Sequence, residues 1–119
     1  RLARQALAES HETTVLDDVA EITAKAVFDA YKAGDKVAAG VVDKFAAVLG
    51  RGLSIVSCVA DPEIFVIGGG VSKAGQPLLD AVQKVFKAET FAACREAKFA
   101  LATLGNDAGI YGCVRLILE

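Results

Sequence analysis

This chain of 119 residues contains no methionine and no tryptophan, and it has only two prolines and one histidine. Because translation starts at methionine, a chain without one is expected to be part of a longer product. A catalytic role for a single histidine would need a partner residue that the sequence does not identify. The single histidine, His11, stands between Ser10 and Glu12 in a polar stretch. A solvated loop position is therefore the simplest interpretation of His11.

Cysteines are few and widely spaced. The chain has three, Cys58, Cys94 and Cys113, an odd number without Cys-x-x-Cys spacing. This pattern argues against both a zinc-binding cluster and a disulfide framework. Each cysteine has apolar neighbours in the sequence, which predicts small buried side chains.

The chain also lacks a strong excess of charge and a long apolar run. Its formal net charge is −2, which argues against a broad surface for nucleic acid or for anionic membranes. No apolar run reaches the length of a membrane span and no secretory signal is visible, so a cytoplasmic location is expected. Hydrophobic residues nevertheless make up 54% of the sequence. One domain of this size, residues 1–119, cannot bury them all, which predicts an apolar face that meets another domain or partner.

The most informative segment is an apolar run that ends in three glycines. Ile64–Ile67 is preceded by Asp-Pro and followed by Gly68–Gly70, which predicts a buried strand over 63–68. Glycines have no Cβ atom, so a flat ligand can approach their backbone closely. A helix is predicted over 77–89, since Pro77 is a natural first-turn residue. Strand, glycine turn and helix in succession are typical of a nucleotide site at the carboxyl end of a strand.

Two common phosphate-binding motifs do not fit this turn. The dinucleotide fingerprint G-x-G-x-x-G matches Gly68 and Gly70 but needs a third glycine where Lys73 stands. The P-loop pattern matches Gly70 and Gly75, but the lysine that should come next is a glutamine. The turn could hold a purine or a ribose against bare backbone, or it could be a tight strand-to-helix connection without a ligand. The glycines alone leave both interpretations open.

A second turn of the same kind lies near the end of the chain. The sequence predicts a strand over 98–103, a Gly-Asn-Asp turn, and a helix over 106–118 that Asn106 or Asp107 can cap. Two consecutive strand-turn-helix units predict parallel strands whose turns lie at the same edge of the sheet. A ligand at that edge would contact both turns, so Asn106 is a second candidate binding residue.

Helices are predicted over most of the remaining chain. A short one covers 2–8, and another runs from the polar pair Asp17-Asp18 to Gly34. Asp35 then suits the N-cap of a long helix, in which apolar residues recur every three or four positions. The segment 53–60 is apolar all round and is expected to be deeply buried. The predicted class is α/β, helix-rich with two parallel strands.

These motifs resemble those of the ROK sugar kinases (repressor, open reading frame, kinase), and among them the bacterial glucokinases. The matching pieces occur in the expected order and are ITAKAVF (22–28), AGD (33–35), PEIFVIGGGVS (62–72) and LGNDAGIYG (104–112). The resemblance implies part of an actin-like ATPase domain of the ribonuclease H-like type. It also implies that the intact enzyme uses ATP and Mg²⁺ to convert a hexose, glucose in the first place, to its 6-phosphate.

The resemblance further implies roles for individual residues. Gly68, Gly69, Gly70 and Val71 would lie against the adenine or ribose of ATP, and Asn106 would be a further contact. The family's phosphate loop, catalytic aspartate, sugar-binding residues and zinc motif have no counterpart in this sequence. No catalytic or metal-binding residue is therefore assigned here, and these features are expected in an N-terminal part of the same protein. The chain alone is expected to be inactive, and the intact enzyme is expected to be a homo-oligomer.

Two other interpretations are open. The ROK family also contains transcriptional repressors, so the chain could belong to the sugar-sensing part of a repressor. Alternatively, it could be a helical interaction domain that binds no small molecule. A nucleotide titration would separate this last interpretation from the first.

Overall fold

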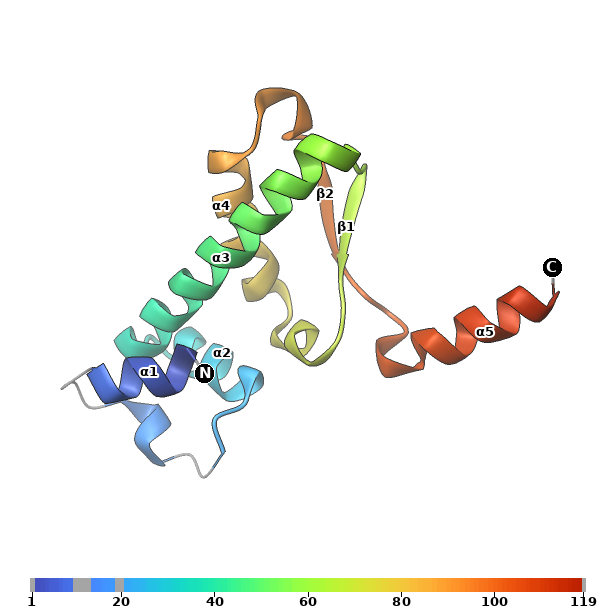
Figure 1. Cartoon of the computed structure of the whole chain (residues 1–119). Coiled ribbons are helices and arrows are strands. Elements are labelled where there is room, and N and C mark those ends of the chain that lie inside the picture. Colours follow the sequence, from blue (N-terminus) through green and yellow to red (C-terminus); the bar gives the residue numbers. More distant parts are fainter. Residues whose placement is uncertain (1, 10–13, 19–20, 119) are drawn as a thin grey trace.

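The structure, a computed structural model, describes residues 2–9, 14–18 and 21–118, and for Asn106 it describes the backbone alone. The helices and strands follow in the order α1 (Leu2–Glu9), α2 (Ala24–Lys32), α3 (Lys36–Ala60), β1 (Ile64–Ile67), α4 (Gln76–Glu89), β2 (Lys98–Leu101) and α5 (Ala108–Leu118). Short 3₁₀ turns connect them: η1 (Val15–Asp18), η2 (Gly70–Ala74), η3 (Ala92–Cys94) and η4 (Gly105–Asp107). The long helix α3 runs diagonally through the molecule, with α1 and α2 at its start and α4 packed along it, while α5 projects away (Figure 1).

Capping side chains set where α2 and α3 begin. The Thr23 hydroxyl accepts a hydrogen bond from the Ala26 N–H at 3.2 Å, so α2 begins at Ala24. The expected start near Asp17-Asp18 was wrong, because those residues form η1 instead. The predicted cap of the long helix is confirmed, since Asp35 Oδ1 accepts from the Ala38 N–H at 2.8 Å.

Asp35 also links η1 to the start of α3 through hydrogen bonds. Its Oδ2 atom accepts hydrogen bonds from the Thr14 hydroxyl at 2.7 Å and from the Val15 N–H at 2.9 Å. The hydrogen bond from the Ala38 N–H is the largest of the effects that lower the pKa of Asp35, and burial opposes it. The ionised carboxylate is therefore the form that holds this corner of the fold together.

Asp35→Ala should lower the free energy of unfolding at pH 7 by about 1–2 kcal/mol, the usual cost of losing an N-cap. Because the folded-state pKa is depressed below 3.8, the carboxylate stabilises the fold above pH 4, and this contribution is lost as the pH falls through the folded-state pKa. Urea unfolding at pH 7 and at successively lower pH should therefore show a shrinking difference between the variant and the wild type. Asp43→Ala, in which the altered residue is exposed on α3, is the control. A difference that stays constant with pH would contradict this role of the carboxylate.

One face of the sheet packs on α4 through aromatic rings. The Phe86 ring is fully buried and lies 5.6 Å from the Phe65 ring and 5.1 Å from the Phe99 ring, measured between centroids. The opposite face is uncovered in this chain, where Ile64 and Val66 of β1 are exposed. The four-residue strands thus have one packed face and one unpartnered face.

The two strands pair in parallel, with Ile64 opposite Lys98 and Ile67 opposite Leu101. The Ala102 N–H donates to the Ile67 carbonyl at 2.9 Å, so the two carboxyl ends leave the sheet side by side. The predicted parallel pairing, with both turns at one edge, is confirmed. Each strand is shorter than predicted, because the glycine turn begins at Gly68 and pairing ends just after β2.

The expected deep burial of segment 53–60 was wrong. Val59 is 85% exposed and Ile55 is 66% exposed, and the buried positions of this segment are Ser54 and Ser57. The C-terminal half of α3 packs against α4 on one side only, so its remaining apolar side chains face solvent. The expected burial of the cysteines was also wrong, since Cys58 and Cys113 are exposed and Cys94 is half-buried.

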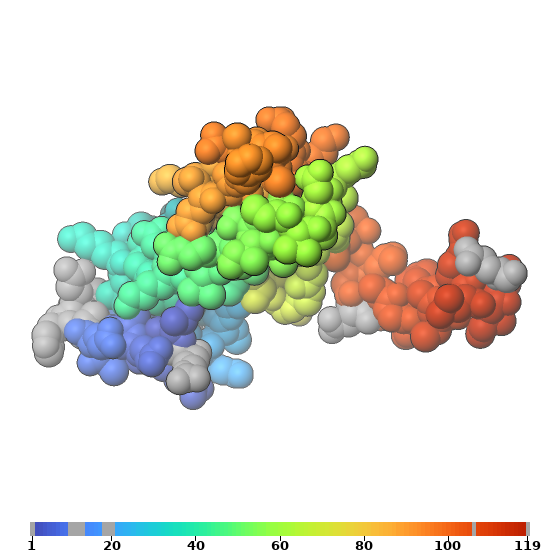
Figure 2. Space-filling view, turned by 45° about the horizontal axis from the view of Figure 1, so that its top comes forward, coloured from blue at the N-terminus to red at the C-terminus, as the bar shows by residue number. Residues whose placement is uncertain are grey.

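The last helix, α5, carries an unpartnered apolar surface. None of its described residues is buried, and its exposed apolar side chains are Ile110, Tyr111, Val114, Leu116, Ile117 and Leu118. Figure 2 shows α5 as a separate projection beside the main body. Within the described parts of the chain, no helix combines the length and the apolar character needed to cross a membrane.

Candidate functional site

The candidate site is built around the glycine turn that follows β1. Gly69 has φ +76° and ψ −164°, a backbone conformation that only glycine adopts readily. The turn is closed by Ser72, whose N–H and hydroxyl both donate to the Gly69 carbonyl, at 3.2 and 2.7 Å. The chain therefore reverses abruptly at the carboxyl edge of the sheet and enters η2.

The three glycines of this turn have different surroundings. A Cβ atom added at Gly68 would lie 3.2 Å from the Ala102 Cβ, so Gly68 permits close packing of the two strand ends. A Cβ atom added at Gly69 or Gly70 would meet nothing within 4 Å. Only Gly69 and Gly70 therefore present backbone to open space where a ligand could approach.

A cavity of about 510 Å³, here called the glycine-turn pocket, lies between this turn and the beginning of α2. Its walls come from two segments far apart in the sequence and consist of Thr23, Ala24, Lys25, Gly70, Val71 and Lys73. Cavities of this volume are typical of sites for small molecules and cofactors. The pocket thus joins the glycine turn to a part of the fold that supplies both a helix N-terminus and lysine side chains.

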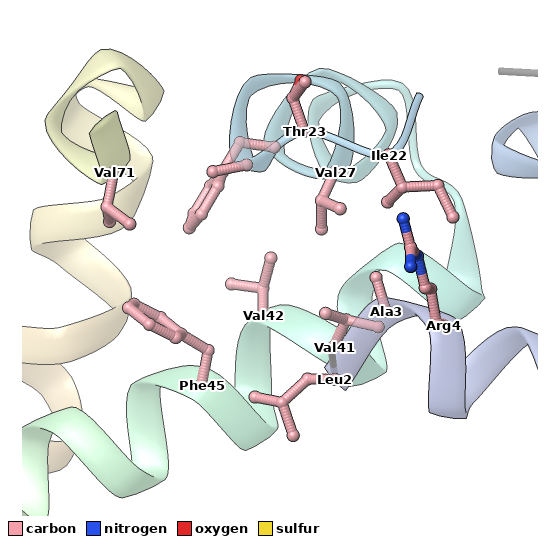
Figure 3. A pocket seen from close by; sticks show the side chains of 12 residues that line it. Leu2, Ala3, Arg4, Ile22, Thr23, Val27, Val41, Val42, Phe45 and Val71 are labelled. Atoms are coloured by element: carbon pink, nitrogen blue, oxygen red, sulfur yellow. The ribbon is translucent and has the colours of Figure 1, made fainter. Parts of the chain in front are cut away.

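A second cavity of about 420 Å³ adjoins this pocket and shares Thr23, Ala24 and Val71 with it. The other walls of this apolar cavity come from α1, α2, α3 and Ile22, and they are mostly aliphatic or aromatic. Figure 3 shows Val27, Val42, Phe45 and Val71 directed toward its interior. Val71 therefore stands between a pocket with lysines at its walls and an apolar cavity.

The lysines of the glycine-turn pocket differ in their surroundings. Lys25 Nζ lies 2.8 Å from Asp29 Oδ2 in an exposed ion pair one helical turn apart. The hydrogen bond between them is the main reason that the pKa of Lys25 is raised and that of Asp29 is lowered. Lys73 is exposed in η2 and makes no ion pair or hydrogen bond with the described residues. Lys73 is therefore the cation in this pocket that is not already paired.

The structure brings some of the predicted site residues together. Gly70 and Val71 line the glycine-turn pocket, and Gly68 and Gly69 lead into it. Asn106 lies in η4, but its side chain is outside the described residues, as is all of His11. Among the residues that the structure describes, no group of three or more His, Cys, Asp or Glu side chains could hold a metal ion.

Sequence reasoning did not identify the opposite wall of the pocket. Thr23, Ala24 and Lys25 fall within the ITAKAVF piece that carries part of the resemblance, but no binding role was assigned to them. The resemblance of the ITAKAVF piece to the family was the one feature of the sequence that pointed to these residues. Nothing in the local sequence pattern places the start of α2 beside the glycine turn. Only the packing of α2 against η2 does so.

Comparisons with known proteins match this architecture. A glucokinase from Halalkalibacterium halodurans is 40% identical over 116 residues, which cover 94% of this chain and 35% of that protein. A crystal structure from Cytophaga hutchinsonii, provisionally assigned as a sugar kinase, superposes with a TM-score of 0.87 at 26% identity and covers 99% of this chain. The crystal structure of a ROK family glucokinase from Streptomyces griseus, in complex with glucose and AMPPNP, gives a TM-score of 0.67 at 33% identity over 76% of this chain.

The chain is much shorter than these proteins. It spans 35% of the Halalkalibacterium glucokinase, 40% of the Cytophaga chain and 30% of the Streptomyces chain. A xylose repressor from Caldicellulosiruptor bescii also matches, at 25% identity over 87% of this chain and 26% of the repressor. The relatives therefore include both named kinases and a named regulator.

The predicted fold class is confirmed, since the helix-rich α/β arrangement with two parallel strands is part of an actin-like ATPase domain. The profile described as the ROK family matches residues 2–119, which is almost the whole chain. The chain belongs to the ROK family.

Proposed function

We propose that this chain supplies the adenosine side of the ATP site of a sugar kinase, and that the intact enzyme is a glucokinase. The observation that carries the proposal is the glycine-turn pocket, in which Gly70 and Val71 meet the start of α2 at the carboxyl edge of two parallel strands. In open α/β sheets, ligands bind outside the carboxyl ends of the strands. The named glucokinase relative at 40% identity supports the same choice of activity.

The turn has the form that a nucleoside requires. Gly69 and Gly70 expose backbone without side chains, so a ribose or base can approach to van der Waals distance. Val71 offers an apolar side chain toward the base, next to the apolar cavity. In this proposal Gly68 spaces the two strand ends, Gly69 and Gly70 contact the nucleoside, and Asn106 of the second turn is a further contact.

The chain's share of the chemistry is binding and orientation. Bound ATP supplies the phosphoryl group and brings Mg²⁺ with its phosphates, and transfer to a sugar hydroxyl depends mostly on positioning and charge stabilisation. We assign the base that accepts the hydroxyl proton, the sugar contacts and the zinc site to other parts of the intact protein. Residues 1–119 then form one domain that does not turn over substrate alone, within an enzyme that we expect to be cytoplasmic.

The unpartnered apolar faces support a role within a larger assembly. Val66 on the uncovered sheet face and Ile117 on α5 are both well exposed in this chain. Exposed apolar surface of this kind marks contact with another protein surface. In the proposal, the rest of the same polypeptide covers these faces, and a second copy completes a homo-oligomer.

The test is a pair of measurements on the intact protein. Isothermal titration should detect binding of ATP or AMPPNP, and a coupled assay of ADP release should detect turnover with glucose and Mg²⁺ that exceeds turnover with N-acetylgalactosamine or xylose. The 119-residue chain alone should show no release of ADP above background. Sugar binding without nucleotide binding or turnover would instead favour a sugar-sensing repressor, and absence of both nucleotide and sugar binding would favour a helical interaction domain.

A further inference from the structure

We infer that Lys73, assisted by Lys25, holds an anionic phosphate of the nucleotide at the glycine-turn pocket, so that the pocket selects nucleotides over uncharged nucleosides. This inference rests on the proposed function, because it assumes that the glycine turn receives a nucleoside. It adds a contact that neither the glycines nor the family motifs assign.

The geometry brings positive charge from two separate segments to one cavity. Lys25 is on the first turn of α2 and Lys73 is in η2, and both line the glycine-turn pocket. The lysine side chains are exposed, so each ammonium group can turn toward a ligand in the pocket. Two lysines at one small cavity offer charge-assisted hydrogen bonds to phosphate oxygens.

The other charges near the pocket determine which lysine contributes more. Asp29 pairs with Lys25 at 2.8 Å, and its carboxylate both offsets that lysine's charge and repels an anion. Lys73 has no ion-pair partner among the described residues, so its charge is available in full. Thr23 and Ala24 at the start of α2 line the same pocket, and a helix N-terminus adds about half a positive charge there. The two lysines, Asp29 and the helix N-terminus together carry a net positive charge.

Lys73 is distinct from the other lysines that follow it in the chain. Lys84 and Lys87 lie on α4 among acidic residues, and neither lines the pocket. In the sequence, nothing distinguishes Lys73 from the exposed lysines of α4. The structure separates it, because η2 returns beside α2 and places Lys73 at the cavity.

The experiment compares nucleotide and nucleoside binding by the intact protein. Isothermal titration with ATP, ADP and adenosine should give tighter binding of both nucleotides than of adenosine in the wild type. Lys73→Gln should raise the dissociation constants for ATP and ADP about five- to tenfold and leave that for adenosine within about twofold, as expected for one lost hydrogen bond at an exposed site, where water replaces part of the contact. Lys25→Gln should have a smaller effect, about two- to threefold, because Asp29 already offsets that charge.

Lys84→Gln is the matched control, since it removes an exposed lysine of α4 that does not line the pocket. Melting temperatures of all variants should agree with the wild type, which separates binding from folding. If the wild type binds ATP and Lys73→Gln leaves the preference for ATP over adenosine unchanged, the inference is overturned while the proposed function stands. If the wild type binds neither ATP nor adenosine, the proposed function itself fails.

Discussion

Gly70→Val should raise the dissociation constant of the intact protein for ATP at least about tenfold, with little change in the free energy of unfolding. Gly70 lines the glycine-turn pocket, and a Cβ atom built on it meets no other atom within 4 Å. The valine side chain therefore fits the folded protein but occupies space that the nucleoside needs. The same variant should leave the Michaelis constant for the sugar nearly unchanged, since this pocket holds only the nucleotide in the proposed function.

The glycines at the two ends of η2, Gly69 and Gly75, make it possible to separate ligand contact from backbone strain. Gly69 and Gly75 have nearly the same conformation, with φ values of +76° and +75° and ψ values of −164° and −151°. Valine at either position is strained, at a cost of about 1–3 kcal/mol. Gly69→Val should lose both stability and ATP affinity, whereas Gly75→Val should lose a similar amount of stability and keep its ATP affinity.

These variants are compared by ATP titration and urea unfolding at a temperature where each is fully folded. Equal ATP affinity in Gly70→Val and the wild type would mean that the glycine turn is only a tight connection. An equal loss of ATP affinity in Gly69→Val and Gly75→Val would assign the effect to strain. The proposed adenosine contact requires that ATP affinity decrease with substitution at Gly69 and Gly70 and not at Gly75.

Local sequence patterns correctly predicted the helix starts and strands that depend on residues close together in the sequence. Asp35 caps α3 because its own side chain reaches the Ala38 N–H, and Pro77 stands in the first turn of α4. The strand at Ile64–Ile67 is defined by its apolar run and by the glycines that end it. The start of α2 was missed because Asp17-Asp18 and Thr23 are both suitable caps, and the sequence alone does not choose between them.

Features that depend on packing between distant segments were not predictable in this way. Periodicity shows that 53–60 is apolar but not which elements cover it, and Val59 is exposed because α4 packs on one side of α3 only. The same limit applies to the candidate site. The glycine turn was found from its sequence, while the wall formed by Thr23–Lys25 emerged only from the contact of α2 with η2.

The contact between α3 and α4 gives a second prediction, in which the same glycine-to-alanine substitution raises the free energy of unfolding at one position and lowers it at another. Gly50 is buried where these helices touch, and a Cβ atom added there would lie 2.9 Å from the Val85 Cβ and 3.1 Å from the Phe86 backbone nitrogen. Gly40 is exposed on the same helix, and a Cβ atom added there would meet nothing within 4 Å. Of these two glycines of α3, only Gly50 is therefore required to be glycine by packing.

Gly40→Ala should stabilise the protein by about 0.5–1 kcal/mol, because alanine favours the helix over glycine. Gly50→Ala has the same gain in helix propensity but forces α4 away from α3, so we expect a net loss of about 1–2 kcal/mol. Gly50→Val, which adds two further methyl groups at this contact, should cost about 3 kcal/mol or more.

Urea unfolding of the three variants at neutral pH measures these changes directly. The effect of Gly50→Val should extend to the sheet, because moving α4 displaces the Phe86 ring from Phe65 and Phe99. Phe65 lies on the strand that leads into the glycine turn, so this variant should also bind ATP more weakly than its folded fraction explains. A Cβ atom added at Gly50 would lie only 2.9 Å from the Val85 Cβ, so alanine should not fit without moving α4. If Gly50→Ala were instead as stabilising as Gly40→Ala, this close contact between α3 and α4 would be contradicted.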